Sequence, residues 1–139
     1  MKRTLLFIVI FQSLCLGMLA QKGVAVQAAF DELAVEKNVT EVLLGAGRLK
    51  EYRLSLFHSL EIKRPSAGQR RRIDALVQKD AAQALLHEET AGHCLYELPQ
   101  RGGTHCYIFY RCTEQYIILM YIEGKATLKQ IKSYFLKQS

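Results

Sequence analysis

The chain has 139 residues, of which 50% are hydrophobic, 23% are charged and 9% are aromatic. This length suits one domain that can bury a core without a metal or disulfide. The composition excludes a disordered tail, a collagen, a coiled coil and a multi-pass membrane protein. The formal net charge of +6 does not by itself identify a ligand.

The first 20 residues have the organisation of a secretory signal peptide. A positive start with Lys2 and Arg3 precedes apolar residues and a small residue, Ala20. The uninterrupted apolar run is shorter than the roughly 20 residues that span a bilayer. We expect cleavage after Ala20 and export of residues 21–139, without a transmembrane segment, to the periplasm or outer envelope of a Gram-negative bacterium. A membrane anchor, a buried helix and a lipid anchor at Cys15 are the competing interpretations.

The first half of the mature chain predicts one helix and two strands. Val24–Val35 has apolar residues at helical spacing, and Asn38–Leu44 is a Val- and Thr-rich strand that ends at the Gly45–Gly47 turn. Tyr52–Ile62 alternates in period two, with its even-numbered residues on one apolar face. Its other face is mostly polar, which indicates a strand covered on one side.

The second half predicts two helices and three strands. Ser66 can cap a long helix over Ala67–Leu86. The three strands that follow are His93–Leu98, Thr104–Cys112 and Tyr116–Glu123. The last of them is apolar on both faces, which favours the middle of a sheet or a position under a partner.

A final helix begins after Thr127, with Lys129, Lys132 and Lys137 on its outer face. The predicted order over residues 21–139 is α-β-β-α-β-β-β-α. Consecutive strands in this order form hairpins. The order therefore predicts a single α+β domain with a mainly antiparallel sheet of about five strands and helices packed on one face.

Three cysteines remain after removal of the signal peptide: Cys94, Cys106 and Cys112. Cys106 and Cys112 share one strand face and lie about 20 Å apart, beyond the roughly 7 Å limit for a disulfide. A bridge therefore needs Cys94. A two-residue turn at Gly102-Gly103 places Cys94 opposite Arg111, whereas a longer loop moves it toward Cys106. A disulfide through Cys94 and free thiols both remain open.

No complete catalytic set is evident, and we predict no metal and no cofactor. In His93-Cys94 and His105-Cys106 the adjacent side chains point to opposite faces of a strand, which disfavours zinc. The alternative function is a cysteine-dependent enzyme or thiol-redox protein using Cys94 or Cys106 with a histidine. The candidate bases are His58 and His105, although the place of His58 on an apolar strand face favours a core histidine.

Five cations surround the start of the long helix: Lys63, Arg64, Arg70, Arg71 and Arg72. Helix N-terminal amides also attract anions. An exported protein rarely meets nucleic acid, so we expect an anionic polysaccharide, a lipid head group or an acidic protein surface. A solvent-exposed helix face without a partner is the competing interpretation.

Several segments carry a resemblance to a known group of proteins. They are Tyr52–Leu60, then Val77–Asp80 in a basic helix, and Tyr121–Gly124 before a lysine-rich helix. Together they resemble a family of small secreted proteins of unknown function from gut Bacteroidetes. The resemblance covers most of the mature chain and implies an exported α+β domain, with no catalytic residue carried over.

These observations favour a non-enzymatic binding or scaffold module of the cell envelope. The doubly apolar segment Ile117–Ile122 is the candidate contact region. We expect it to contact a second copy of the chain, giving a homodimer, or another envelope protein.

Overall fold

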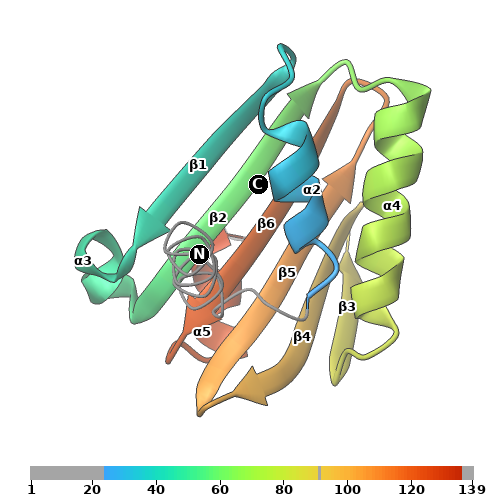
Figure 1. The fold of residues 1–139 in the computed structure, drawn as a ribbon. Coiled ribbons are helices and arrows are strands. Elements are labelled where there is room, and N and C mark those ends of the chain that lie inside the picture. Colours follow the sequence, from blue (N-terminus) through green and yellow to red (C-terminus); the bar gives the residue numbers. More distant parts are fainter. Residues whose placement is uncertain (1–23, 91, 136–139) are drawn as a thin grey trace, which may run out of the picture.

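The structure is a computed structural model that describes residues 24–90 and 92–135. The predicted signal peptide and Lys137 lie outside these residues. One sheet runs through the domain in the strand order β1-β2-β6-β5-β4-β3 (Figure 1). Its strands are β1 (Val39–Gly45), β2 (Leu54–Lys63), β3 (Leu86–Thr90), β4 (His93–Arg101), β5 (Thr104–Cys112) and β6 (Tyr116–Gly124). All neighbouring strands are antiparallel, which confirms the α+β class with six strands rather than five.

The helices divide between the two faces of the sheet and do not share one face as the sequence predicted, because the apolar residues of the last helix pack on the opposite side. Helices α2 (Gln27–Leu33) and α4 (Ala67–Ala81) lie on one face, which we call the α2/α4 face (Figure 1). Helix α5 (Leu128–Phe135) packs on the other, the α5 face, where Phe135 stacks on Phe57. The short helix α3 (Ala46–Leu49) and the 3-10 helix η1 (Lys50–Tyr52) connect β1 to β2.

The start of α4 follows the sequence prediction, but its end does not. Ser66 caps the helix in a capping box with Gln69. The helix ends at Ala81 rather than Leu86, because Leu86–Thr90 forms the additional strand β3 against β4. Backbone pairing with β4 outweighs the helical spacing of the apolar residues there. Leu85, which lies within the predicted helix, is 67% exposed.

The α2/α4 face holds the larger core. Ile73 and Val77 of α4 and Leu60 and Leu119 of the sheet are all fully buried in it. Asp80 of α4 accepts hydrogen bonds from the amides of residues 25 and 26, at 2.7 and 2.8 Å. A carboxylate more than fifty residues away thereby caps the start of α2, which has no side-chain cap of its own.

The central position predicted for the last strand is confirmed, since β6 lies between β2 and β5. Ile117 and Ile122 are fully buried, whereas Ile118 and Met120 are half-buried on the α5 face. The region expected to contact a partner is therefore largely covered within one chain. Thr127 and Gln130 begin α5 with reciprocal backbone-to-side-chain hydrogen bonds.

One irregularity changes the predicted alternation of β2. The register shifts between Leu54 and Leu56, so Leu54 joins the α5-face core while Leu56 packs on the opposite face. Gly124 of β6 faces this bulge. A Cβ atom there would lie 2.5 Å from the Arg53 carbonyl oxygen and 2.6 Å from the Leu54 Cα. Only glycine lets the two chain segments approach this closely.

Candidate functional site

The five cations singled out from the sequence do not form one free surface. Arg72 binds Glu32 of α2 through two hydrogen bonds of 2.9 and 2.7 Å. Arg70 donates to the Thr113 carbonyl at 2.7 Å and to the Cys112 Sγ at 3.3 Å. These two guanidinium groups therefore hold α4 to α2 and to the β5–β6 turn.

The other three cations lie around the end of β2 and the first turns of α4. Lys63, Arg64 and Arg71 are exposed. The Arg64 backbone has a positive φ of 50°, and its amide donates to the Gln115 carbonyl at 2.8 Å. These side chains share a region, but Arg70 and Arg72 of the predicted cluster are engaged in contacts within the chain.

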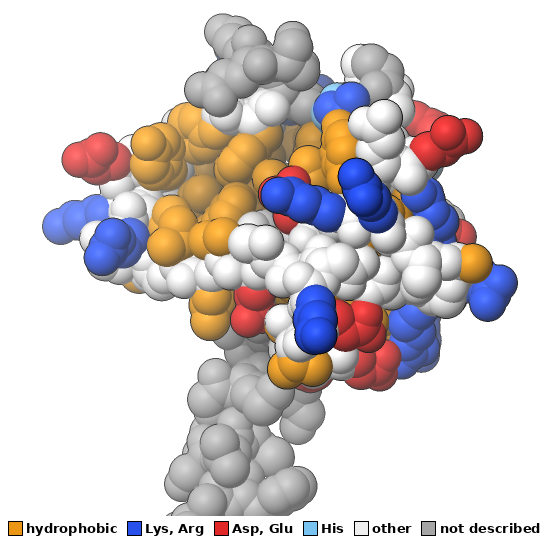
Figure 2. All heavy atoms as spheres, turned by 90° about the horizontal axis from the view of Figure 1, so that it is seen from above, with side chains coloured by type: hydrophobic (Ala, Val, Ile, Leu, Met, Phe, Trp, Pro, Cys, Tyr) orange, Lys and Arg blue, Asp and Glu red, His pale blue; other side chains and the backbone are white. Residues whose placement is uncertain are grey.

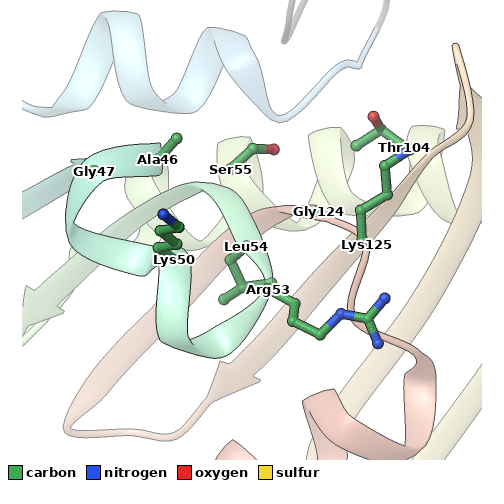
Figure 3. Close-up of a pocket in the computed structure, with 9 residues that line it drawn as sticks. All are labelled: Ala46, Gly47, Lys50, Arg53, Leu54, Ser55, Thr104, Gly124 and Lys125. Carbon is green, nitrogen blue, oxygen red and sulfur yellow. The ribbon is translucent and has the colours of Figure 1, made fainter.

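A different basic region surrounds a pocket of about 550 Å³ at the other end of the sheet. Its lining comes from the β1–β2 connection, the start of β2, the start of β5 and the end of β6 (Figure 3). The lining residues are Ala46, Gly47, Lys50, Arg53, Leu54, Ser55, Thr104, Gly124 and Lys125. Three of them are cations and none is a carboxylate.

The backbone around Arg53 holds this pocket together. Arg53 ends η1 in the left-handed region, with φ 58° and ψ 34°. Its carbonyl oxygen accepts hydrogen bonds from the amides of Lys125 and Ala126, at 2.9 and 3.1 Å. The close approach at Gly124 lies beside these bonds. The β1–β2 connection is thereby fixed against the end of β6.

The side chains give the pocket its chemical character. In Figure 3, Lys50 and Lys125 lie on opposite sides of the view with Ser55 between them, and the Arg53 guanidinium extends beneath Lys125. The Lys125 ammonium donates to the carbonyl of residue 103 at 3.1 Å. Ser55 donates to the carbonyl of residue 123 at 3.3 Å. A concave surface lined by positive charges focuses a positive potential, which attracts anions.

Two carboxyl groups are adjacent in sequence to lining residues: that of Glu51, which is exposed, and that of Glu123, which is 7% exposed. The Tyr121 hydroxyl donates to the Glu123 Oε2 at 2.7 Å. Burial raises the pKa of the Glu123 carboxyl, and the Tyr121 hydrogen bond opposes that rise. Glu123 is buried beside Tyr121 and is not among the residues that line the pocket.

A second pocket, of about 400 Å³, is apolar and lies on the α5 face. Its lining includes Leu44, Tyr52, Phe57, Tyr134 and Phe135. Figure 2 shows hydrophobic side chains gathered in a hollowed area on the side of the sheet that carries α5. This region has few polar groups to orient a ligand, so its chemistry is less specific than that of the basic pocket.

The histidine and cysteines of the alternative function are held apart by the sheet. The His58 Nε2 lies 2.7 Å from the Glu41 Oε2, and its ring stacks on Phe30 with centroids 3.7 Å apart. Cys106 lies on β5, separated from the strand of His58 by β6, and Cys94 lies one strand farther away. With strands about 4.8 Å apart, neither thiol is next to His58.

The three thiols are free cysteines in this structure. The turn has two residues, as one predicted register required, but a bulge between Leu98 and Arg101 places Cys94 opposite Tyr110 instead of Arg111. Burial raises the pKa of the Cys94 thiol and that of the Cys106 thiol. A raised pKa keeps a thiol protonated near neutral pH, which disfavours a nucleophilic role.

Within residues 24–90 and 92–135, no group of three or more His, Cys, Asp or Glu side chains has the arrangement of a metal site. Among these same residues, no helix combines the length and the apolar character needed to cross a membrane.

The basic pocket has no sequence signature, because Lys50, Arg53 and Lys125 come from segments more than seventy residues apart. The predicted cluster at α4 was visible because its cations are close in sequence. The only local signal for the pocket is Gly124, which marks the close approach of two segments.

A family model described as a family of unknown function (DUF6108) matches residues 13–135 of the chain. No curated protein matches the chain.

Proposed function

This chain belongs to the DUF6108 family, and on that premise we propose that it is an exported, non-enzymatic binding protein of the bacterial envelope. Its ligand carries a phosphate, sulfate or carboxylate group that enters the basic pocket. The observation that carries this proposal is the pocket lining, which combines three cations and two hydroxyl side chains with no carboxylate.

The ligand class follows from the charge and the size of the pocket. Lys50 and Lys125 supply ammonium donors, and Ser55 and Thr104 supply hydroxyl groups that also bond to sugars or phosphate oxygens. A volume of about 550 Å³ lies in the range of small-molecule sites. An anionic saccharide or another small anionic metabolite fits this combination better than an extended polymer does.

The proposed absence of catalysis is supported by the separation of the reactive groups. His58 is paired with Glu41 at 2.7 Å, and the Cys94 and Cys106 thiols have raised pKa values. Activation of a thiol nucleophile requires a nearby base or a lowered pKa. At Cys94 and Cys106 the pKa is raised rather than lowered, and His58 lies on a strand that is not adjacent to either thiol.

Ligand binding is tested by NMR titration of the ¹⁵N-labelled chain with three separate probes: inorganic phosphate, inorganic sulfate and glucuronate. We expect saturable amide shifts at Lys50, Ser55 and Thr104 with at least one probe. The double variant Lys50→Gln/Lys125→Gln should weaken that binding at least about tenfold, the loss of roughly 1.4 kcal/mol.

The matched control is the double variant Lys63→Gln/Arg71→Gln, which removes the same charge from the cluster predicted from the sequence. Binding should be retained in this control. If the control loses binding and the pocket variant keeps it, the ligand binds at the start of α4 and the pocket proposal is wrong. Absence of saturable shifts with all three probes also contradicts it.

Export is tested separately by intact-mass measurement of the protein isolated from its native bacterium. We expect a mature N-terminus at Gln21 and recovery in the envelope fraction. Recovery of the cytoplasmic protein with Met1 retained would contradict export without affecting the binding result.

A further inference from the structure

We propose that β1 is a self-association strand: it pairs, antiparallel, with β1 of a second copy of this chain about a two-fold axis at Leu43. β1 is an outer strand of the sheet, with β2 as its neighbour. This inference does not depend on the basic pocket or on export.

The open side of β1 presents backbone groups ready to pair. The amide of Lys63 in β2 donates to the Asn38 carbonyl at 3.0 Å. Residues that bond to a given neighbour alternate along an antiparallel strand, so the even-numbered residues of β1 bond to β2. The backbone amide and carbonyl groups of Glu41 and Leu43 therefore point away from β2.

The side chains of β1 differ from those of the other outer strand. Leu43 is 58% exposed and Val42 is 40% exposed, in the middle of a seven-residue strand. At the opposite edge, β3 has five residues with the sequence LHEET. Its Glu88 forms an ion pair with Lys132 of α5. Short, charged edges resist pairing, whereas a longer apolar edge invites it.

A second copy is the occupant because β1 is complementary to itself. With the axis at Leu43, this residue faces its counterpart, Val42 faces Leu44 of the partner, and Glu41 faces Gly45 of the partner. The two exposed apolar residues of β1 then become buried across the new strand pair. Side chains on the same face of each copy remain on the same face of the joined sheet.

Glu41 does not oppose this arrangement. Its carboxylate already lies 2.7 Å from the His58 Nε2 of its own chain, and in this register it meets no carboxylate of the partner. A register shifted by about four residues, with the axis at Glu41, would place the two Glu41 side chains opposite each other, which is unfavourable. The charge therefore selects against the shifted register while permitting the one proposed.

The proposal places the homodimer contact at β1 rather than at Ile117–Ile122, where the central strand is largely buried. Strand-edge pairing of about five residues buries less surface than the roughly 800 Å² per partner of a standard stable interface. We therefore expect association in the micromolar range, with monomer and dimer in exchange.

The test is sedimentation velocity of the chain from about 1 µM to about 1 mM. The wild-type protein should shift from monomer to dimer across this range. Leu43→Lys should weaken association at least about tenfold, because it places two like charges at the axis. Leu86→Lys, the same substitution on the β3 edge, is the matched control and should leave the dimerisation curve unchanged.

A second measurement tests the register. In a Cys112→Ser background, Leu43→Cys should form an intermolecular disulfide on mild oxidation, because directly opposed residues of paired strands lie within disulfide range. Glu88→Cys in the same background should not. A monomer at all concentrations, a dimer unaffected by Leu43→Lys, or binding of a peptide strand without self-association would each contradict the proposal.

Discussion

The two faces of the sheet differ in how completely they are covered and in the polar groups that they bury. On the α2/α4 face, two helices enclose a core that also contains the buried side chains of His58, Gln69 and Asp80. On the α5 face, the eight-residue helix α5 and the short α3 cover a smaller core, and Phe57 and Met120 remain half-buried. Buried polar groups require specific partners, whereas half-buried apolar groups only need an adjacent surface.

This difference gives the two faces unequal tolerance of substitution. Polar links such as the Asp80 carboxylate fix the helices of the α2/α4 face in one position. The α5 face has an apolar pocket of about 400 Å³, and Val42 and Leu44 of β1 lie along the same face. We infer that the α2/α4 face contributes most of the stability of the domain and that the partly covered α5 face tolerates substitutions.

The largest expected contrast lies between two neighbours in β6. Leu119 is fully buried on the α2/α4 face, whereas Met120 is half-buried on the α5 face. Leu119→Ala should lower the free energy of unfolding by about 3–5 kcal/mol through lost burial and a cavity. Met120→Ala should cost less than about 1.5 kcal/mol. Urea denaturation of both variants measures the contrast, and equal losses would show that the two faces contribute equally.

An intermediate effect is expected from the link between α4 and α2. Asp80→Ala leaves the amides of Ala25 and Val26 without their carboxylate acceptor, at a cost of about 2–3 kcal/mol. Asp74→Ala, an exposed position of the same helix, should change stability by less than about 0.5 kcal/mol. Chemical denaturation distinguishes the variants, and hydrogen exchange should show faster exchange in α2 for Asp80→Ala alone. Unchanged protection of α2 would mean that packing, not this cap, holds the helix.

The smallest effect concerns the pH dependence of the α2/α4 face. Burial raises the pKa of Glu123 above its ordinary value of 4.5, so the folded chain holds this proton more tightly than the unfolded chain. The free energy of unfolding is therefore unaffected at low pH and decreases as the pH rises from about 4.5 through the raised pKa. Glu123→Gln stays neutral and should therefore gain stability relative to wild type over that window.

Thermal unfolding of both proteins, measured from about pH 4 to about pH 8, tests the Glu123 effect. Glu114→Gln, at an exposed position in the β5–β6 turn, is the control for losing one carboxylate. A constant difference between wild type and Glu123→Gln at every pH would contradict the raised pKa.

The sequence predicts elements well where one local pattern dominates. Ser66 and Thr127 mark helix starts, and the apolar residues on both faces of Ile117–Ile122 correctly indicate the central strand. Prediction from the sequence fails where long-range strand pairing determines the local structure. Leu86–Thr90, for example, pairs with β4 instead of extending α4. Bulges at Leu54 and Leu98 are set by contacts between strands, and no local period encodes them.

The same reasoning explains the limits at the candidate site. Neighbouring cations in sequence predicted a cluster at α4, but Arg70 and Arg72 bind groups on other elements. The basic pocket brings together Lys50 and Lys125, which only the β2–β6 pairing places near each other. A charge pattern along the chain therefore identifies candidates, and tertiary contacts decide which of them face a ligand.

The Asp80 cap also has a practical consequence for labelling experiments. Because the carboxylate holds the amides of Ala25 and Val26, the chain enters the domain beside the last turn of α4 (Figure 1). A fluorophore placed at Val24 would report on that helix end, with the sheet separating it from α5. Labels at Val24 and at Ser133 would therefore follow the two faces independently in one molecule.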